Sequence, residues 1–538
     1  MTPTRAAFIS WLVLALVTLA VPQGLHFFDP VLPLRALEQS QSGVSPNWNT
    51  LARVDPADLA RDRLEWLGWW APGTSLLLLP GLAADLPAGH LLRALTLVAL
   101  LAGCLGWTRW FARQPLPHSW LLALAVSLPW MRYGSSNLFR YSAEILAFAA
   151  APWVFLSLAN VARDPAWQHA GRLALLGAAL GFAYWLKFSL FLVVLAAVAA
   201  LAWSLWRTAP DRRPALRLTA VLVAFLALAP LAWLLIDRTH GGVTPLGAPR
   251  TISWSPELFL SAIANPALAL ADAFGPLFFV LVHPGLLGFG GHTLDAVAWL
   301  GLPGGLLLIF LLVRAVRRRS DSIEGSLAAF ALAGLTAILA TLWLFADVDR
   351  MPRHVAQVSL AALPVALAEG LDWWRSARAR LTRPLLAAAA TLYVVAPLAF
   401  GFCYVAAKLT QRHDATRSPH ALALWSLPAD ETLPAKLRDL HRADPAALLV
   451  VSDPEMSLLW PGRALWNFAG RSVGEDLQHS YHGVPSDFAW STSSPVTLHV
   501  LGRPGVALPA PLDHSRFTVS DTWQGAHSTL VTGRLDPR

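Results

Sequence analysis

Residues 7–25 read AFISWLVLALVTLAVPQGL and run straight into His26-Phe27-Phe28-Asp29-Pro30. The first segment is apolar over nearly all its length and matches the roughly 20 residues that a helix needs to cross a bilayer. Asp29 is therefore expected where a membrane helix meets water, at the head of a loop that ends in Trp69-Trp70-Ala71-Pro72-Gly73. A carboxylate fixed at such a boundary is a candidate for chemistry, although it can also simply mark the end of a helix.

The rest of the chain repeats this pattern of long apolar runs. With 55% hydrophobic residues, 14% charged residues and a mean hydropathy of +0.50 over 538 residues, it is not an ordinary soluble globular protein. Each run must be helical in lipid, because any other backbone leaves polar groups unpaired. We therefore predict an all-α polytopic membrane protein with about eleven crossings, near residues 7–25, 91–108, 119–131, 144–161, 172–186, 188–206, 218–236, 297–313, 325–345, 355–371 and 385–406.

The formal net charge of +8 comes largely from arginines in short loops between the apolar runs. That pattern is typical of membrane topology and not of nucleic-acid binding, and the positive-inside rule places these loops in the cytoplasm. The N-terminus, with Arg5, belongs on the same side, so an odd number of crossings leaves the C-terminus outside. A cleaved signal peptide is the alternative for the first 25 residues, but Val21-Pro22-Gln23-Gly24 is a poor cleavage site. The five loops carry Arg109 and Arg113; Arg163 and Arg172; Arg207, Arg212, Arg213 and Arg217; Arg314, Arg317, Arg318 and Arg319; and Arg375, Arg378, Arg380 and Arg383.

The segments that face outward hold most of the other polar residues. Residues 72–82 are too short to cross and contain Pro80, so we expect an interfacial or re-entrant helix. The stretch 237–296 is also predicted to lie in the interface, and one extra hairpin is the alternative there. From residue 408 to 538 polar residues return and short β-like runs appear at 447–452, 496–501, 517–520 and 529–532, which predicts a small α/β soluble domain after the membrane domain of residues 1–407.

Two negative observations narrow the function. The two cysteines, Cys104 and Cys403, lie inside apolar spans and predict neither a disulfide nor a metal site. Glycine-containing segments lack the spacing of a phosphate loop or a dinucleotide fingerprint. Nucleotide and nucleic-acid binding are therefore not expected, and the strong preference for Arg over Lys is typical of a GC-rich bacterial genome.

The loop after the first helix carries a recognisable order of residues. Asp29 opens it, Arg35-Ala36 and Gly43 follow, and Trp69 and Trp70 precede the Ala-Pro-Gly that closes it. This order resembles the first outer loop of the GT-C superfamily of membrane glycosyltransferases, which includes lipid A aminoarabinose transferases and protein O-mannosyltransferases. Many relatives have a second acid directly after the first, whereas this chain has Pro30.

Three further segments carry carboxylates or cations of the kind that can act on, or bind, a phosphate-linked substrate. Arg140-Tyr141-Ser142-Ala143-Glu144 is similar to the second outer loop of the GT-C superfamily, where an acid opens the fourth helix; alternatively, Glu144 is a helix N-terminal carboxylate favoured by the dipole. Lys187 stands midway in an apolar stretch, and therefore at its outer turn, against the positive-inside trend. Alternatively, the Lys187 side chain snorkels, so that its ammonium group reaches the lipid headgroups.

The last segment lies just before a proline-bearing helix. Residues 347–354 read DVDRMPRH and resemble the arginine–tyrosine segment found late in GT-C enzymes, with His354 where tyrosine is usual. Arg350 and Arg353 can bind phosphate oxygens in a bidentate way. Local ion pairing with Asp347 and Asp349 is the alternative, and two acids at this spacing define no metal site.

The resemblance implies a bacterial inner-membrane enzyme that transfers a sugar from a polyprenyl-phosphate donor to a periplasmic glycan, lipid or protein acceptor with inversion. It implies that Asp29 is the catalytic base and that Glu144 assists it. Lys187, Arg350 and Arg353 are expected to bind the donor phosphate, while Trp69, Trp70, Arg140, Tyr141 and His354 contact substrate. No cofactor is demanded, although some GT-C enzymes use a divalent metal. The alternatives are a transporter or flippase of a lipid-linked or polar solute, and a non-catalytic scaffold.

Overall fold

The chain divides into two compact units. Unit 1 contains Met1–Ala20, Thr96–Leu235 and Arg250–Leu409, and unit 2 contains Val21–Leu95, Ile236–Pro249 and Thr410–Arg538. The computed structural model describes residues 1–20, 34, 37, 48–49, 58–61, 65–66, 71–84, 86, 88–135, 142–208, 212–240, 256–274, 293–319, 322–345, 352–376, 430, 432–451, 454–468, 471–472, 491–502, 504–505 and 516–537.

The helices of unit 1 follow the predicted crossings closely. Every predicted crossing from 7–25 to 355–371 falls on a helix, and the one at 385–406 lies outside the described residues. In chain order the helices are α1 Pro3–Ala20, α4 Ala88–Phe111, α5 His118–Ser135, α6 Ala143–Arg163, η1 Pro165–Gln168, α7 Ala170–Gly181, α8 Ala183–Leu186, α9 Phe188–Thr208, α10 Arg212–Leu226, α11 Leu228–Thr239, α12 Pro256–Phe274, α14 Thr293–Arg318, α15 Ile323–Phe345, η3 Pro352–His354 and α16 Ala356–Arg375. Of these, α4 begins and α11 ends in unit 2.

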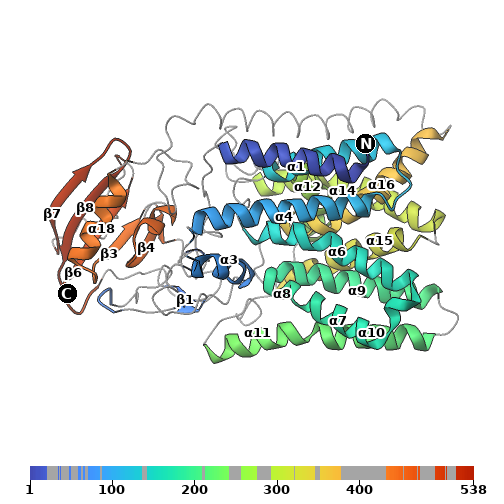
Figure 1. The fold of residues 1–538 in the computed structure, drawn as a ribbon, viewed down its shortest axis with the longest axis horizontal. Helices are drawn as coiled ribbons and strands as arrows, with labels where there is room; N and C mark the ends of the chain where they lie inside the picture. Colours follow the sequence, from blue (N-terminus) through green and yellow to red (C-terminus); the bar gives the residue numbers. More distant parts are fainter. Residues whose placement is uncertain are drawn as a thin grey trace. The chain divides into compact units, whose positions relative to one another are not determined.

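Several of these helices are long and apolar enough to cross a membrane. Within the described ranges five qualify, at His90–Phe111, Ala143–Arg163, Phe188–Arg207, Ala215–Thr239 and Ile323–Leu342. Shorter apolar helices cover Pro3–Thr18, Ala170–Leu186 and Phe259–Leu270. Figure 1 shows α6, α9 and α10 running alongside one another, as expected for neighbouring spans. The prediction of a polytopic helical membrane protein is confirmed.

The stretch 237–296 contains one described helix before α14. Residues 256–274 form α12, which packs against α14, α15 and α16, and whether this stretch lies in the interface or forms an extra hairpin stays a prediction. Two glycines on α14 make this contact close: a Cβ on Gly305 would collide with the carbonyl oxygen of Ile263, and one on Gly301 would lie 2.5 Å from Leu268 Cγ. Small residues four apart let membrane helices approach in this way. The packing partner is therefore encoded on α14, outside the segment itself.

Helix α4 is bonded to both α6 and α16 through buried tryptophans. The indole N–H of Trp107 donates to the carbonyl of Phe148 on α6 at 3.1 Å, and that of Trp110 donates to the carbonyl of Ala361 on α16 at 2.9 Å. Both indoles are completely buried. A buried tryptophan needs a partner for its N–H, so these two bonds fix α6 and α16 against α4 as well as filling the core.

Unit 2 contains a mixed six-stranded sheet in the order β5-β4-β3-β6-β8-β7 (Figure 1). Runs predicted at 447–452, 496–501, 517–520 and 529–532 all fall on strands, so the expected α/β domain is confirmed; β4, β5 and α18 were not predicted. The strands and helices of this unit are β1 Trp48–Asn49, β2 Glu65–Trp66, α3 Gly73–Ala83, α18 Leu433–Ala443, β3 Leu448–Val451, η7 Pro454–Leu459, β4 Arg463–Phe468, β5 Arg471–Ser472, β6 Val496–Gly502, β7 Phe517–Gln524 and β8 Thr529–Leu535. The boundary at residue 407 stays a prediction, because 377–429 are not described.

The strand patterns explain this sheet order. β3 reads Leu-Leu-Val-Val, is buried throughout and pairs in parallel with β4 and β6, as continuous apolar strands do when both faces are covered. β7 is an edge strand with mostly exposed, polar residues and an irregularity between Val519 and Asp521. Polar residues and bulges at an edge discourage pairing with other chains.

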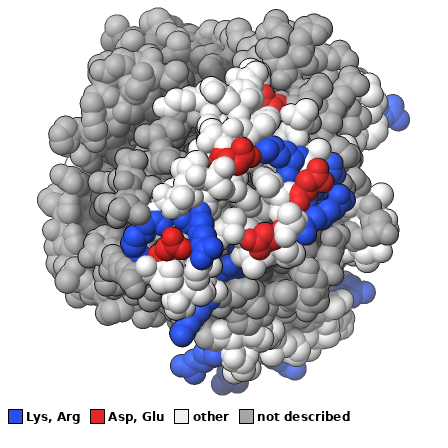
Figure 2. Space-filling model, turned by 90° about the vertical axis from the view of Figure 1, so that its left-hand side faces the viewer, with Lys and Arg blue, Asp and Glu red and all other residues white. Residues whose placement is uncertain are grey.

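Charges on the surface of unit 2 are largely paired. Figure 2, turned so that the left-hand side of Figure 1 faces the viewer, shows Lys and Arg side chains directly beside Asp and Glu side chains. The ion pairs of this unit include Lys436 with Asp521 at 3.5 Å, Arg442 with Asp439 at 3.2 Å and Arg534 with Asp536 at 3.0 Å. Exposed pairs of this kind add little stability, typically ~0–1 kcal/mol.

Candidate functional site

The first residue of the site is fixed by the start of α6. Ser142 is the N-cap of that helix: its hydroxyl oxygen accepts a hydrogen bond from the backbone N–H of Glu144 at 3.3 Å. The same hydroxyl donates to the carboxylate of Glu144. Serine is a preferred N-cap because it pairs a backbone N–H that the helix leaves open. The cap therefore sets both the first turn of α6 and the orientation of the Glu144 side chain, which is 5% exposed.

Lys187 occupies a break between two helices. It is the single extended residue between α8 and α9, with φ −165° and ψ 128°, and its backbone N–H donates to the carbonyl of Ala183 at 3.0 Å. Its ammonium group donates to Glu144 Oε1, and the residue is only 9% exposed. The sequence predicted a turn at this position, and the turn is present. Snorkelling does not describe this lysine, because its charged end bonds a buried carboxylate.

Arg353 brings a second cation to the same oxygen. It lies on η3, directly before α16, and its Nη1 donates to Glu144 Oε1 at 3.4 Å. The pairs join residues 43 and 209 positions apart in the chain. The structure thus brings together Glu144, Lys187 and Arg353, which the sequence analysis had selected separately.

His354 lies beside this cluster. Both of its ring nitrogens are buried, and neither forms a hydrogen bond with a described residue. Burial lowers the pKa of His354 well below the ordinary histidine value, and the charges of Arg353 and Lys187 lower it further. The imidazole is therefore neutral at neutral pH. A neutral histidine can donate one hydrogen bond and accept another, so it can contact a hydroxyl or a phosphate oxygen that enters the cluster.

A further cation near the cluster was missed in the sequence. The guanidinium carbon of Arg132, in the last turn of α5, lies 5.7 Å from the ring centroid of Phe148. Phe148 follows Glu144 by four residues, which places the two side chains on one face of α6, one turn apart. Arg132 is an outward-side arginine that breaks the positive-inside trend, and this signal, already used for Lys187, could have identified it.

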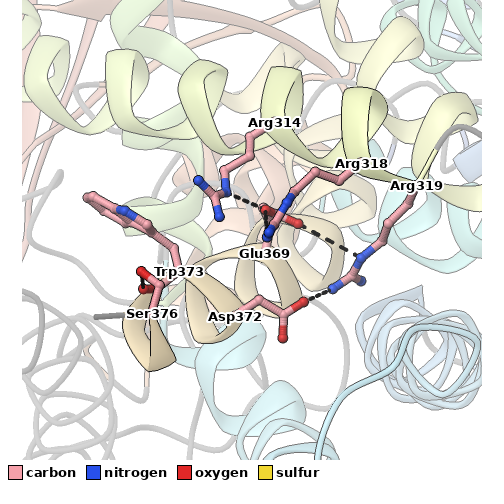
Figure 3. A network of polar contacts seen from close by, with 7 residues as sticks. All are labelled: Arg314, Arg318, Arg319, Glu369, Asp372, Trp373 and Ser376. Atoms are coloured by element: carbon pink, nitrogen blue, oxygen red, sulfur yellow. Dashed lines mark hydrogen bonds and ion pairs between the residues drawn. The ribbon is translucent and has the colours of Figure 1, made fainter. Parts of the chain in front are cut away.

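A different set of charges occupies the opposite ends of these helices. Glu369, on α16, is completely buried and pairs with Arg314, Arg318 and Arg319, while Arg319 also pairs with Asp372 (Figure 3). The sequence analysis treated these arginines as topology signals only. They also neutralise a buried carboxylate, which otherwise carries a large desolvation cost.

A second buried carboxylate lies at the same helix ends as Glu369, opposite the Glu144 cluster. Glu324, at the start of α15, is 1% exposed and pairs with Arg163 at 2.6 Å and with Arg113 at 3.7 Å. Arg163 is the last residue of α6, a helix of 21 residues and hence about 30 Å long, and Glu144 is its second residue. That length equals the thickness of a bilayer core. The Glu144 cluster and the arginine-rich ends therefore lie on opposite sides of a membrane span.

The remaining predicted site residues lie outside the described residues: Asp29, Trp69, Trp70, Arg140, Tyr141 and Arg350, together with Asp347 and Asp349. In the part of the chain that is described, no three His, Cys, Asp or Glu side chains are grouped to hold a metal ion.

Comparison with known proteins gives similarity at the level of fold. No protein-family model matches the chain. No curated protein matches its sequence. A cryo-EM structure of arabinofuranosyltransferase AftD from Mycobacteria matches with 14% identity and a TM-score of 0.45, over 99% of this chain and 42% of AftD. The crystal structure of ArnT from Cupriavidus metallidurans bound to undecaprenyl phosphate matches with 14% identity and a TM-score of 0.45, over 98% of this chain and 97% of that one.

The chain thus spans about two fifths of the length of AftD and nearly all of ArnT. At 14% identity and a TM-score of 0.45, the likeness to these two solved structures assigns no superfamily to the chain and no role to any of its residues.

Proposed function

We propose that this protein is a membrane glycosyltransferase that transfers a sugar from a polyprenyl-phosphate donor to an acceptor hydroxyl on the outer side of the membrane. The observation that carries the proposal is the convergence of Lys187 and Arg353 on one buried carboxylate at the end of a membrane span. A site at that depth is suited to a substrate whose phosphate lies at the headgroup level while its polyprenyl chain stays in the bilayer.

The charge of the cluster suits a phosphodiester. Lys187, Arg353 and Glu144 together carry +1, which matches the single negative charge of a polyprenyl-phosphate sugar. Without donor, Glu144 neutralises part of the cationic charge; with donor, phosphate oxygens can take its place beside Lys187 and Arg353. Arginine suits this exchange because its planar fork can bind two phosphate oxygens.

The reaction adds negative charge at this position. The acceptor oxygen attacks the anomeric carbon, the bond from that carbon to the phosphate oxygen breaks, and the electron pair leaves with the phosphate. Polyprenyl phosphate therefore departs with up to two negative charges, and cations stabilise this developing charge more than they stabilise the bound donor. In the proposed assignment, Arg350 supports Lys187 and Arg353 at this step.

The acceptor proton needs a base on the opposite side of the anomeric carbon. We assign this role to Asp29 and the inversion of configuration to the attack from that side. Glu144 orients the acceptor, and His354, Arg140, Tyr141, Trp69 and Trp70 contact the sugar or the acceptor. No step requires a metal ion.

A transporter is less well supported by the placement of charge. The described ionic clusters lie at the ends of the spans: Glu144 at the start of α6, and Glu324 and Glu369 with their arginines at the other ends. A path for a polar solute needs charged or polar groups along the middle of the spans.

Release of polyprenyl phosphate tests the proposed activity without knowledge of the natural acceptor. The protein in lipid vesicles is supplied with undecaprenyl-phosphate sugars, one at a time, and with a cell-envelope extract as acceptor. We expect at least one donor to release undecaprenyl phosphate at a rate that depends on both protein and extract. Donors that all remain intact, in a preparation that binds undecaprenyl phosphate, would argue for a binding or transport function instead.

Sidedness is the second requirement of the proposal. The arginine-rich ends are assigned to the cytoplasm by the positive-inside rule, so the Glu144 cluster and the C-terminal domain belong to the periplasm. An alkaline phosphatase fused after Arg538 is expected to be active, and one inserted within Arg314–Arg319 is expected to be silent. The reverse pattern would place the cluster where nucleotide sugars are available and would contradict the polyprenyl-donor mechanism.

A further inference from the structure

The first outer loop reaches the core of the C-terminal sheet. Strands β1 and β2 pair antiparallel, with Trp48 opposite Trp66 and Asn49 opposite Glu65, so the two strands form the base of a hairpin. Residues 58–61 lie in the connection of that hairpin. Strand β2 ends only a few residues before Trp69 and Trp70, and the same loop opens at Asp29.

Leu59 is part of the hydrophobic core of the sheet. It is completely buried in one cluster with Leu448 and Val450 of β3, Leu465 of β4, and Leu498 of β6, and the neighbouring Ala60 packs against that cluster. These partners lie 389 to 439 residues further along the chain. Full burial of a leucine side chain contributes about 1.5–3 kcal/mol. The core of the C-terminal sheet is therefore incomplete without a side chain from the first outer loop.

Polar contacts hold the backbone on both sides of Leu59. Its N–H donates to the carbonyl of Ser491 at 2.9 Å, and its carbonyl accepts from Arg463 Nη1 at 3.0 Å. Asp58 Oδ1 accepts from the backbone N–H of Ser493 at 2.9 Å and from that of Ala60 at 3.1 Å. A leucine that only filled a gap in the core would not need hydrogen bonds to its own backbone and to the residues on both sides of it.

The Asp58 contacts persist over the physiological pH range. Hydrogen bonds from Ser493 and Ala60 hold the pKa of Asp58 below its ordinary value, which is about 3.9. A carboxylate with a lowered pKa contributes stability above its ordinary pKa and loses it only as the pH falls through the lowered value. The attachment is therefore expected to be complete from neutral pH down to about pH 5.

We propose, on the basis of the function proposed above, that the C-terminal domain is a clamp for the first outer loop, and that Leu59 and Asp58 are its positioning residues. The clamp holds the hairpin whose two ends lead to Asp29 and to Trp69 and Trp70. It gives the C-terminal domain a role in the reaction without a catalytic residue of its own. Displacement of a catalytic group by about 1 Å can cost ~10² in rate, so an anchor outside the reaction centre can control turnover.

Four variants test the clamp. Leu59→Ala removes the anchor, Leu59→Asp places a charge in the core, and Leu59→Met keeps the volume. Leu437→Ala is the matched control, because Leu437 on α18 is equally buried in the same unit but does not belong to the core cluster that contains Leu59. The readouts are the kcat and KM for an undecaprenyl-phosphate sugar, and the rate of trypsin cleavage at Arg53, Arg61 and Arg63 of the hairpin.

We expect Leu59→Ala to lower kcat by ~10² with little change in the KM for the donor, because the donor cations Lys187 and Arg353 are not on this loop. Leu59→Asp and Leu59→Ala should be cleaved faster than wild type, and Leu59→Met should resemble wild type in both readouts. Leu437→Ala should keep the wild-type kcat and cleavage rate. An unchanged kcat in Leu59→Ala, or equal losses in Leu59→Ala and Leu437→Ala, would overturn the positioning role.

Failure of the proposed function is distinguishable from failure of the clamp. A wild-type protein without transferase activity refutes the function, yet trypsin still reports the attachment of the hairpin. Faster cleavage of Leu59→Asp and Leu59→Ala, but not of Leu437→Ala, then supports the clamp. Equal cleavage of all variants and wild type overturns it.

Discussion

Asp29→Asn is expected to lower the rate of sugar transfer by about 10²–10⁴-fold, the usual contribution of a positioned general base. The substitution removes the base but almost no volume, so insertion into the membrane and binding of the donor should be unchanged. Transfer from a lipid-linked donor is measured in vesicles with equal amounts of inserted protein.

Asp439→Asn serves as the control, because Asp439 is an exposed carboxylate that pairs with Arg442 in the C-terminal domain. It should behave like wild type. Turnover at the wild-type rate in Asp29→Asn would remove Asp29 from the catalytic role and would leave Glu144 as the carboxylate to examine next.

Lys187→Met is expected to lower the rate of transfer by about 10²–10³-fold, the effect that loss of one charge contact to a transition state commonly has. Arg353→Ala should act in the same direction. Both should weaken the use of the donor more than that of the acceptor, since the proposed partner of both cations is the donor phosphate. The kinetic constants for donor and acceptor are measured separately at saturating concentrations of the other substrate.

Two further variants separate a phosphate contact from other effects of charge: Arg353→Lys is the conservative variant, and Lys436→Met is the control. Arg353→Lys keeps the charge but loses the planar fork, so an intermediate rate indicates bidentate binding of phosphate. Lys436→Met removes an ammonium group paired with Asp521 in the C-terminal domain and should have no effect on the donor. Unchanged kinetics in both Lys187→Met and Arg353→Ala would leave structural ion pairing with Glu144 as the better account of the cluster.

The membrane helices could be predicted from the sequence because their signal is local. A long apolar run bounded by arginines has few alternatives in lipid, and ten of the eleven predicted crossings fall on helices while the eleventh is not described. The sequence does not decide whether residues 256–274 lie in the interface or form part of an extra hairpin, because Asn265, Pro266 and Asp272 interrupt their apolar run. The packing of α12 depends on Gly301 and Gly305 of another helix, which no local window contains.

The site could be predicted in part for a similar reason. Lys187 was identified because a lone cation at the outer end of an apolar stretch contradicts the positive-inside trend, and Glu144 because it opens a helix. Their convergence with Arg353 depends on contacts across 43 and 209 positions, which periodicity does not encode. The burial of Leu59 was not predictable, because Leu59 stands alone in a polar segment without a strand or helix pattern.

The buried carboxylates at the other ends of the spans were not anticipated either. Glu324 and Glu369 each compensate arginines that the sequence analysis had used only to count crossings. Loss of one partner of such a buried pair typically costs about 3–5 kcal/mol. The arginines from which the sequence predicts sidedness therefore also join α6 to α15 and α14 to α16.

The central claim is that Lys187 and Arg353 form a binding site for the phosphate of a polyprenyl lipid. Titration of undecaprenyl phosphate into the purified protein, without sugar or acceptor, tests it most directly, with wild type, Lys187→Met, Arg353→Ala and Lys436→Met compared at one ionic strength. We predict saturable binding to wild type and to Lys436→Met, and an affinity at least about tenfold lower in Lys187→Met and Arg353→Ala, equivalent to ~1.4 kcal/mol. Equal affinity in all four proteins would contradict the claim.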